Sequence, residues 1–380
     1  MTKLEFSTSV GFLRYRETPS GRDYLTPLEL EIQKIDIEQM RLFTPESVLQ
    51  QGMGTFDTDK ALEALKRNEG KKILTIDMGG DKVTKIIWQV VDGKLVALDD
   101  QTETVKKEDK GANYMPFFEK VAEEAKRDNL GVAISFAGPL KGTSPIGIPN
   151  AVDFKAALET KYNGDFANLF PSLKVVNNDA QAGIKTAAIE ARRSGKMKEG
   201  GSLEFVINGG GFGLAMIIGD KIIATEVGHV RLVESLNKHR QETPCGLLGR
   251  NYVCIERVAS SGAGVESLWK KITGQHSSGK EISQKYQQGN QIARGLYENS
   301  AFLLAHGIIG IANINDLMQN SNETVIAYHG GGFRVPGLMD RVTQIVAQEK
   351  GTQPTLFTDD ISPNACAEGV AIAAFYENAA

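Results

Sequence analysis

The chain is poor in the residues that mark several protein classes. Its three cysteines, Cys245, Cys254 and Cys366, are too few and too unevenly placed for a disulfide framework, which favours a reducing compartment. The formal net charge of -4 gives no basic footprint for nucleic acid or an anionic membrane. No apolar run is long enough to span a bilayer, and the N-terminus MTKLEFSTSVGFLRYRE has no apolar signal-peptide core. We therefore expect a cytoplasmic protein.

What the chain does contain is typical of a large globular protein. It has 380 residues, of which 41% are hydrophobic and 24% are charged, and this length suffices for two domains with a substantial core. Strand-like and helix-like segments alternate along most of it, which predicts an α/β fold of two lobes with a cleft between them.

Two passages that echo each other dominate the pattern. They are KKILTIDMGGDKVTKIIWQVVDGKLVAL, residues 71–98, and LEFVINGGGFGLAMIIGDKIIATEVGH, residues 203–229. Each reads as a β-branched apolar run, a glycine-rich bend and a second apolar run, which is the pattern of strand, turn and strand. The repetition predicts two similar half-molecules. The matching positions are Asp77 with Asn208, Gly79 with Gly210, and Gly80 with Gly211.

Glycine at a strand-to-strand bend has a possible function. Without Cβ atoms in the way, successive backbone N–H groups can approach an anion and form a phosphate-binding concavity. Two such bends facing each other would hold a polyphosphate between two lobes. The alternative for either bend alone is an ordinary β-turn.

Between the two passages, the order of elements predicts a parallel pair of strands. NYMPFFEKVAEEAKRDN reads as an amphipathic helix, and GVAISFAGP, residues 131–139, as a buried strand. A further strand over 172–176 leads through the polar turn NND into a helix from about Ala180 to Gly195. Such junctions are where α/β proteins place functional side chains. A simple helix N-cap is the alternative for this turn.

The ends of the chain differ in how much they tell. In the C-terminal part we expect helices over 281–318, a strand in TVIAYH, a helix starting near Pro336, a short strand in PTLFT and a final helix. Residues 1–70 are less informative. TDKALEALKRNEG reads as a short helix, and nine Lys/Arg against twelve Asp/Glu weigh against a DNA-binding arm.

Eight short motifs follow one another along the chain: DMGGD, the GP of FAGP, PNAVDF, NNDA, GGGFG, EVGH, CIERVASSG and HGGG. Their order and approximate spacing resemble those of sugar kinases of the ROK (repressor, open reading frame, kinase) family and bacterial glucokinases, over about residues 71–380. The resemblance implies an actin-like ATPase fold (ribonuclease H-like) of duplicated domains, with residues 1–70 as an N-terminal extension of unknown role, 71–178 as the small lobe and 179–380 as the large lobe.

The resemblance also implies roles for individual residues. Asp179 matches the base that takes the proton from a sugar hydroxyl as it attacks the terminal phosphate of ATP. Asp77 matches the carboxylate that positions Mg²⁺ near the phosphates. The positions that match sugar ligands are Asn150, Asn178, Glu226, His229 and Glu256. The positions that match the phosphate and adenosine loops are Gly79, Gly80, Gly210, Gly211, Gly213, Gly331 and Gly332.

Each polar residue also has a plainer interpretation. His229 fits a core histidine, Glu256 a charge on a surface helix, and Glu226 part of a salt bridge. The hypothesis of a shared site depends on their convergence, since carboxylates and an imidazole suit the several O–H donors of a pyranose.

Two positions on the phosphate side depart from the family pattern. The usual DxGGT of the first bend ends here in Asp81, and Gly210 replaces the threonine of the usual GTG in the second. Several interpretations of Asp81 are open. Its side chain turns away from the phosphates, or it binds them through Mg²⁺. Otherwise it marks weakened nucleotide affinity or a donor other than ATP, such as polyphosphate.

A zinc site is the third departure. Many ROK proteins hold structural zinc with a histidine and a CxCGxxGC cluster, but Thr243 occupies the first cysteine position. Only His229, Cys245 and Cys254 remain, with His239 as a speculative fourth ligand, and structural zinc needs four. We predict no zinc.

The sequence thus predicts an ATP- and Mg²⁺-dependent hexose kinase acting on the 6-hydroxyl of glucose or a close analogue. We expect its partners to be a sugar, a nucleotide and a second copy of the chain in a homodimer, with no membrane and no nucleic acid. The rival hypothesis is a ROK-type sugar-sensing regulator or binding protein with weak or no kinase activity.

Overall fold

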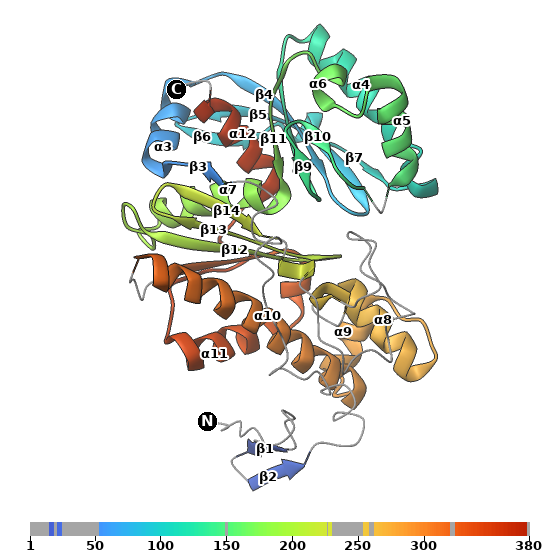
Figure 1. The fold of residues 1–380 in the computed structure, drawn as a ribbon, viewed down its shortest axis with the longest axis vertical. Coiled ribbons are helices and arrows are strands. Elements are labelled where there is room, and N and C mark those ends of the chain that lie inside the picture. The colour runs from blue at the N-terminus through green and yellow to red at the C-terminus, as the bar shows by residue number, and fades with distance from the viewer. Residues whose placement is uncertain are drawn as a thin grey trace.

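Two β-sheets with helices between and outside them make up the molecule (Figure 1). The computed structural model describes residues 15–18, 21–24, 53–148, 151–225, 227–229, 254–257, 262–319 and 324–377. Within them, the layers run from outer helices through the first sheet, a central layer of helices and the second sheet to further outer helices.

The first sheet follows the order β11-β8-β4-β5-β6, with β7 also paired to β5. β4 is antiparallel to β5 and parallel to β8, as the predicted strand-helix-strand order requires. Its strands are β4 (Lys72–Met78), β5 (Lys82–Val91), β6 (Lys94–Ala97), β7 (Glu103–Lys106), β8 (Gly131–Phe136) and β11 (Leu173–Asn178). A short hairpin follows β8, formed by β9 (Leu140–Lys141) and β10 (Ser144–Pro145).

The second sheet has the order β16-β15-β12-β13-β14-β3. β12 is antiparallel to β13 and parallel to β15, and β16 is parallel to β15, just as β11 is parallel to β8. The predicted duplication into two similar halves is confirmed by this shared connectivity. The strands are β12 (Ser202–Asn208), β13 (Phe212–Ile218), β14 (Lys221–Thr225), β15 (Thr324–His329), β16 (Thr355–Leu356) and β3 (Met53–Thr55).

The central layer contains the helix that follows the last strand of each half. α7 (Asp179–Arg193) follows β11 and packs on the second sheet, whereas α12 (Ala365–Glu377) follows β16 and packs on the first. Each of these helices carries a glycine at its fifth position: Gly369 lets α12 approach α7, and Gly183 lets α7 approach β12. A Cβ atom at Gly369 would lie 1.8 Å from the carbonyl oxygen of Ala182, and one at Gly183 would lie 2.3 Å from the Phe205 ring. Small residues and aliphatic side chains fill this central core.

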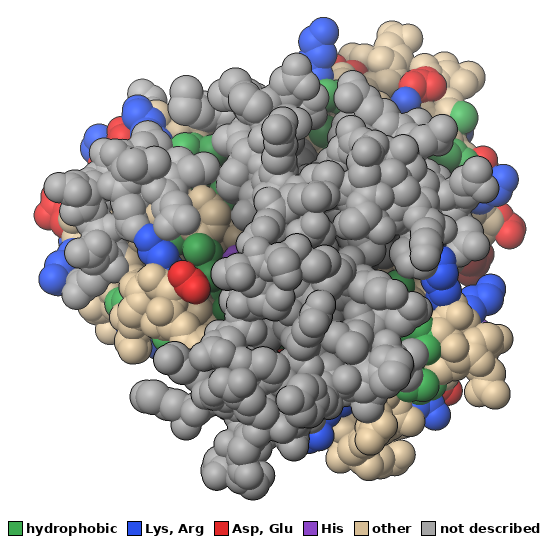
Figure 2. Space-filling view, turned by 60° about the horizontal axis from the view of Figure 1, so that its bottom comes forward, with side chains coloured by type: hydrophobic (Ala, Val, Ile, Leu, Met, Phe, Trp, Pro, Cys, Tyr) green, Lys and Arg blue, Asp and Glu red, His purple; other side chains and the backbone are tan. Residues whose placement is uncertain are grey.

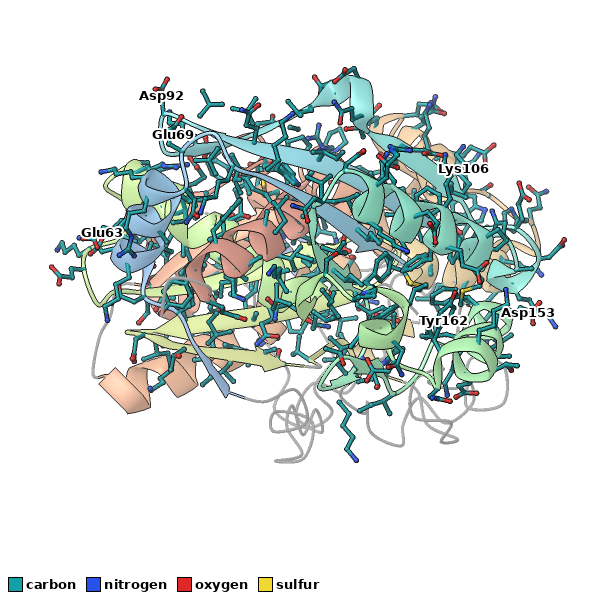
Figure 3. All side chains as sticks on the ribbon, turned by 90° about the horizontal axis from the view of Figure 1, so that it is seen from above. Glu63, Glu69, Asp92, Lys106, Asp153 and Tyr162 are labelled. Carbon is teal, nitrogen blue, oxygen red and sulfur yellow. The ribbon has the colours of Figure 1, made fainter. Side chains whose placement is uncertain are left out.

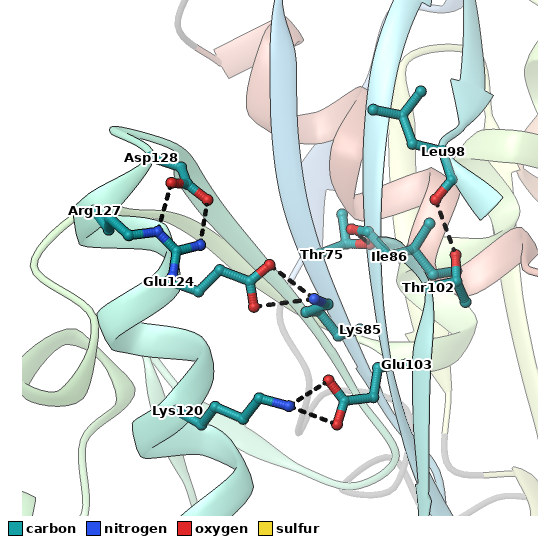
Figure 4. Close-up of polar contacts among 10 residues, drawn as sticks. All are labelled: Thr75, Lys85, Ile86, Leu98, Thr102, Glu103, Lys120, Glu124, Arg127 and Asp128. Atoms are coloured by element: carbon teal, nitrogen blue, oxygen red, sulfur yellow. Dashed lines mark hydrogen bonds and ion pairs between the residues drawn. The ribbon is translucent and has the colours of Figure 1, made fainter. Parts of the chain in front are cut away.

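Outer helices cover the remaining face of each sheet and form a separate hydrophobic core there. Ion pairs tie α4 to the first sheet: the Lys85 ammonium on β5 donates to Glu124 at 2.8 and 3.0 Å, and Lys120 donates to Glu103 at 2.8 Å (Figure 4). The predicted helices over 281–318 and near the C-terminus are confirmed. The outer helices are α4 (Tyr114–Arg127), α5 (Val152–Tyr162), α6 (Phe166–Leu169), α8 (Gly262–Thr273), α9 (Gly279–Gln287), α10 (Gln291–Gln319) and α11 (Leu338–Lys350).

Part of the segment before residue 71 belongs to the folded body. α3 (Thr58–Arg67) confirms the predicted short helix, with Asp57 as its N-cap, and it packs against α12 and α7. Glu69 accepts hydrogen bonds from the backbone of Asp92 at 3.0 Å and of Gly93 at 3.1 Å, and Glu69 and Asp92 are neighbours in Figure 3. Further toward the N-terminus, β1 (Tyr15–Thr18) and β2 (Gly21–Tyr24) form an antiparallel hairpin.

The described surface has mixed charge. Basic and acidic side chains alternate around the rim of the face in Figure 2, as expected for 43 Lys/Arg and 47 Asp/Glu. Among the described helices, none combines the length and hydrophobicity that crossing a lipid bilayer requires.

Candidate active site

Asp77 and Asp179 meet at one edge of the first sheet. β4, β8 and β11 run parallel, and the register places Asp77 of β4 beside Ser135 of β8, which in turn lies beside Asn177 of β11. Asp179 follows two residues later as the first residue of α7. Because the carboxyl ends of parallel strands share an edge, strand order alone brings these two carboxylates together.

Asn178 fixes the turn that presents Asp179. Its side-chain oxygen accepts hydrogen bonds from the backbone of Ala180 at 3.0 Å and Gln181 at 3.3 Å, and its amide donates to the carbonyl of Gly138 at 3.3 Å. The N-cap of this helix is therefore Asn178, which satisfies the first-turn donors. Asp179 accepts from Ala180 at 2.8 Å. The predicted sugar contact of Asn178 stays a prediction.

The carboxyl of Asp179 has an unusual acidity. Its pKa is raised to about 7, mainly by burial and also by the nearby negative charges of Asp77 and Glu256, against the opposing hydrogen bond from Ala180. Burial also raises the pKa of Asp77, although the Ser135 hydroxyl and the Lys82 charge oppose this. The structure therefore brings together three of the predicted site residues from distant segments of the chain: Asp77, Asp179 and Glu256.

Glu256 rests against the second glycine bend. It lies in a short 3-10 helix, η6 (Ile255–Arg257), and its Oε2 accepts a hydrogen bond from the backbone N–H of Phe212 at 3.0 Å. A Cβ atom at Gly211 would lie 2.7 Å from the same oxygen. The bend must be free of side chains here for the carboxylate to approach the backbone.

The two glycine bends face each other. A Cβ atom at Gly210 would lie 3.7 Å from Oδ2 of Asp81. The first bend is closed by a hydrogen bond from the Gly79 N–H to the Lys82 carbonyl at 3.0 Å, and the second by one from Gly209 to Gly211 at 2.9 Å. The two departures from the family pattern, Asp81 and Gly210, are thus direct neighbours across the two halves.

A third glycine loop lies against the end of β12. Gly330 has a φ of 101°, in the region that favours glycine, and a Cβ there would lie 2.4 Å from the Asn208 carbonyl oxygen. A Cβ at Gly332 would lie 2.6 Å from the Asn208 amide, whereas nothing lies within 4 Å of one at Gly331. This loop, which includes η7 (Gly331–Arg334), therefore lies beside Asn208, where β12 leads into the second bend. A Cβ atom at Gly213, the second residue of β13, would lie 3.8 Å from the Ala180 side chain, which is an ordinary van der Waals distance.

Several of the other predicted site residues lie outside the described part of the chain. Asn150 and Glu226 lie outside the described residues, as do Cys245 and His239 of the zinc question. His229 ends a short 3-10 helix, η4 (Val227–His229), of which Val227 and Gly228 are buried. Among the side chains that the structure describes, no three His, Cys, Asp or Glu residues are grouped to hold a metal ion.

Two residues near the site were not singled out by the sequence. Lys107 donates from Nζ to the Gly80 carbonyl and to Oδ1 of Asp81, both at 3.2 Å. Cys366, a free buried thiol at the start of α12, has a pKa raised by burial and by Asp77 and Asp179. Neither position carries a motif. The pairing of β7 with β5 would have been the only guide to Lys107.

The chain belongs to the ROK family, since the ROK family model matches residues 73–373. Its fold is that of solved sugar kinases at low identity. A ROK hexokinase from Thermus thermophilus is 18% identical, with a TM-score of 0.54 over 81% of this chain and 99% of that chain. A ROK glucokinase from Streptomyces griseus, solved with glucose and AMPPNP, is 19% identical, with a TM-score of 0.52 over 79% and 98%.

A glucokinase from Balamuthia mandrillaris, solved with glucose, is 14% identical, with a TM-score of 0.58 over 83% of this chain and 98% of that chain. No curated protein matches the sequence significantly. The likeness to these structures confirms the predicted two-lobed, actin-like α/β fold.

Proposed function

We propose that the protein is an ATP-dependent hexose kinase with Asp179 as the general base. The observation that carries the proposal is the half-buried Asp179 carboxyl, with a pKa of about 7, close to Asp77, which precedes the first glycine bend, and to Glu256, which contacts the second. A base whose pKa lies near the working pH exchanges protons most effectively. The ATP analogue and glucose bound to the Streptomyces griseus glucokinase support the choice of donor and acceptor.

The proposed reaction assigns each bond to a group. The sugar hydroxyl oxygen forms a bond to the terminal phosphorus as the bond from that phosphorus to the bridging oxygen of ADP breaks. Ionised Asp179 accepts the hydroxyl proton. The backbone N–H groups of the two glycine bends stabilise the charge on the phosphoryl oxygens.

Asp77 is the residue that would hold Mg²⁺ together with the phosphates. Its carboxyl is a hard oxygen ligand at the bend, and Mg²⁺ is usually bound by one or two carboxylates plus phosphate oxygens and water. The absence of a further acidic cluster among the described side chains is compatible with such a shared site. When bound, the ion neutralises charge on the transferred group.

On the acceptor side, Glu256 is the described residue that can accept hydrogen bonds from sugar hydroxyls. One oxygen already accepts from the Phe212 backbone, which orients the carboxylate. We propose that Asn150, Asn178, Glu226 and His229 complete this site, and that the protein acts in the cytoplasm as a homodimer.

A panel of sugars and donors with ADP detection tests the proposal. Glucose and its close analogues with Mg-ATP should release ADP in a sugar-dependent manner, and polyphosphate tested with phosphosugar detection decides whether ATP is the donor. If no sugar in the panel is phosphorylated with any of the donors, the kinase assignment is refuted.

One observation favours the second candidate, a sugar-sensing regulator. Asp81 places a negative charge opposite Gly210, where the family holds hydroxyl groups. A mobility-shift experiment with DNA, with and without sugar, distinguishes the two functions, because only the regulator should change its DNA affinity with sugar.

A further inference from the structure

Strand register places Lys107 next to the first glycine bend. β7 pairs with β5 so that Lys106 is opposite Lys82, and the next pair outward is therefore Lys107 with Asp81. The backbone N–H of Lys107 donates to the Asp81 carbonyl at 2.9 Å. A residue distant in sequence from the bend thus becomes its immediate cross-strand neighbour.

The side chain of Lys107 folds over the bend. Its ammonium donates to the Gly80 carbonyl and to Oδ1 of Asp81, each at 3.2 Å. The Lys107 side chain is 26% exposed and that of Asp81 is 85% exposed. The positive charge therefore lies against the phosphate-binding backbone, while the carboxylate extends toward Gly210 of the other half.

Asn113 holds the backbone around Lys107. Its amide donates to the Lys106 carbonyl at 2.7 Å, and its side-chain oxygen accepts from the Glu108 N–H at 3.1 Å. A change of partner by the lysine therefore needs only its side-chain torsions, without movement of the strand end.

The pair with Asp81 is easily exchanged. Exposed lysine-carboxylate pairs contribute little free energy, about 0 to 1 kcal/mol, whereas a polyphosphate offers several anionic oxygens to one ammonium. The two contacts use two of the three N–H donors of the ammonium. A polyphosphate bound at the bends is thus the stronger partner for Lys107.

We propose that Lys107 is a donor-binding residue that contacts phosphate oxygens directly, and that Asp81 holds it over the bend in the ligand-free protein. Lys107 supplies the favourable contact that the missing hydroxyls no longer give, and Asp81 competes with the phosphates for it. The inference rests on the proposed function, because it requires a phosphorylated donor between the bends.

Isothermal titration of the full chain with Mg-AMPPNP tests the proposal. Lys107→Met should weaken binding about 10- to 100-fold, the usual cost of a lost hydrogen bond between charged groups. Asp81→Asn should strengthen it, because a competitor for the ammonium is removed. Lys120→Met is the matched control: it breaks a similar exposed pair, with Glu103 at the other end of β7, and should bind as wild type does.

The Lys107→Met substitution in Asp81→Asn protein distinguishes direct contact of Lys107 with phosphate from an indirect effect through Asp81. In Asp81→Asn protein, Lys107→Met should still weaken binding about 10-fold or more, because the lysine contacts phosphate itself. Disappearance of the loss in that background would mean that Lys107 only masks Asp81, and would overturn the proposal. Wild-type affinity in Lys107→Met protein that still phosphorylates sugar would overturn it while leaving the kinase assignment intact. Wild-type protein that binds no phosphoryl donor would overturn both.

Discussion

The two halves of the chain share the same strand connectivity but differ in the charged side chains near their glycine bends. The first bend is flanked by Asp77 and Asp81, whereas the corresponding positions of the second half hold Asn208 and Phe212. The helix after the last strand begins with Asp179 in the first half and with Ala365 in the second. Charged groups are thus concentrated on one side of a nearly symmetric frame.

This difference shows which properties duplication preserves. Strand order, the antiparallel hairpin and the fifth-position glycines of α7 and α12 recur because they determine packing. The ionisable residues do not recur, as expected if the proposed phosphoryl transfer needs one base and one metal-binding carboxylate. Glu256 adds a carboxylate to the second bend, where we propose that it binds the acceptor.

The largest expected effect comes from the first residues of the two central helices. Asp179→Ala should reduce kcat about 1,000-fold, within the usual range for a general base, with little change in sugar affinity. Cys366→Ala, at the second position of α12, should retain most activity. Steady-state ADP release and sugar titration measure both, and near-full activity of Asp179→Ala would show that the base is misassigned.

Alanine substitutions of the fifth-position glycines in the same two helices should destabilise the protein to different degrees. Gly369→Ala places a methyl group against the Ala182 backbone, which cannot move aside, and should destabilise by about 3 kcal/mol. Gly183→Ala meets the ring of Phe205, which can shift, and should cost about 1 to 2 kcal/mol.

Urea unfolding of the two variants measures the difference. Gly279→Ala in α9, where a Cβ would have an ordinary 3.4 Å contact with Glu266, is the control. A loss for Gly369→Ala no larger than that for Gly279→Ala would show that α7 and α12 contact each other more loosely than the structure indicates.

Substitutions of two adjacent glycines in the second bend should affect the KM values of different substrates. Gly211→Ala displaces the Glu256 carboxylate and should raise KM for the sugar about 10-fold. Gly210→Ala approaches Asp81 instead and should cause a smaller change, in KM for ATP. Bisubstrate kinetics distinguish them, and the reverse pattern would contradict the placement of Glu256 on the acceptor side.

The last prediction concerns the pH dependence of stability. Because burial raises the folded-state pKa of Asp179 to about 7 from an ordinary value of 3.8, the folded protein binds the proton more tightly than the unfolded chain. Its stability should therefore fall as pH rises from about 4 through 7. Asp179→Asn should have a higher Tm than wild type at pH 8, and this difference should be much smaller at pH 5, measured by calorimetry. A difference of equal size at both pH values would contradict this.

Local patterns were enough for most elements. The alternation of apolar residues in 71–98 and 203–229 predicted both hairpins, and the polar turn before Ala180 predicted the junction of β11 and α7. The cap was assigned less well, because Asn and Asp both suit this position and only the hydrogen bonds show that Asn178 fills it. The contribution of β3 and α3 to the folded body was not anticipated, since an edge strand of three residues carries little pattern.

The sequence by itself determined the duplicated strand-bend-strand plan and the residue types available for chemistry, because these follow from hydrophobic periodicity and glycine placement within short windows. Only the tertiary structure decided that Asp81 faces Gly210, that Lys107 lies over the first bend, and that Asp77, Asp179 and Glu256 share one site. Such contacts depend on strand order and register between distant segments, and so does the burial that shifts the Asp179 pKa. No local pattern encodes either.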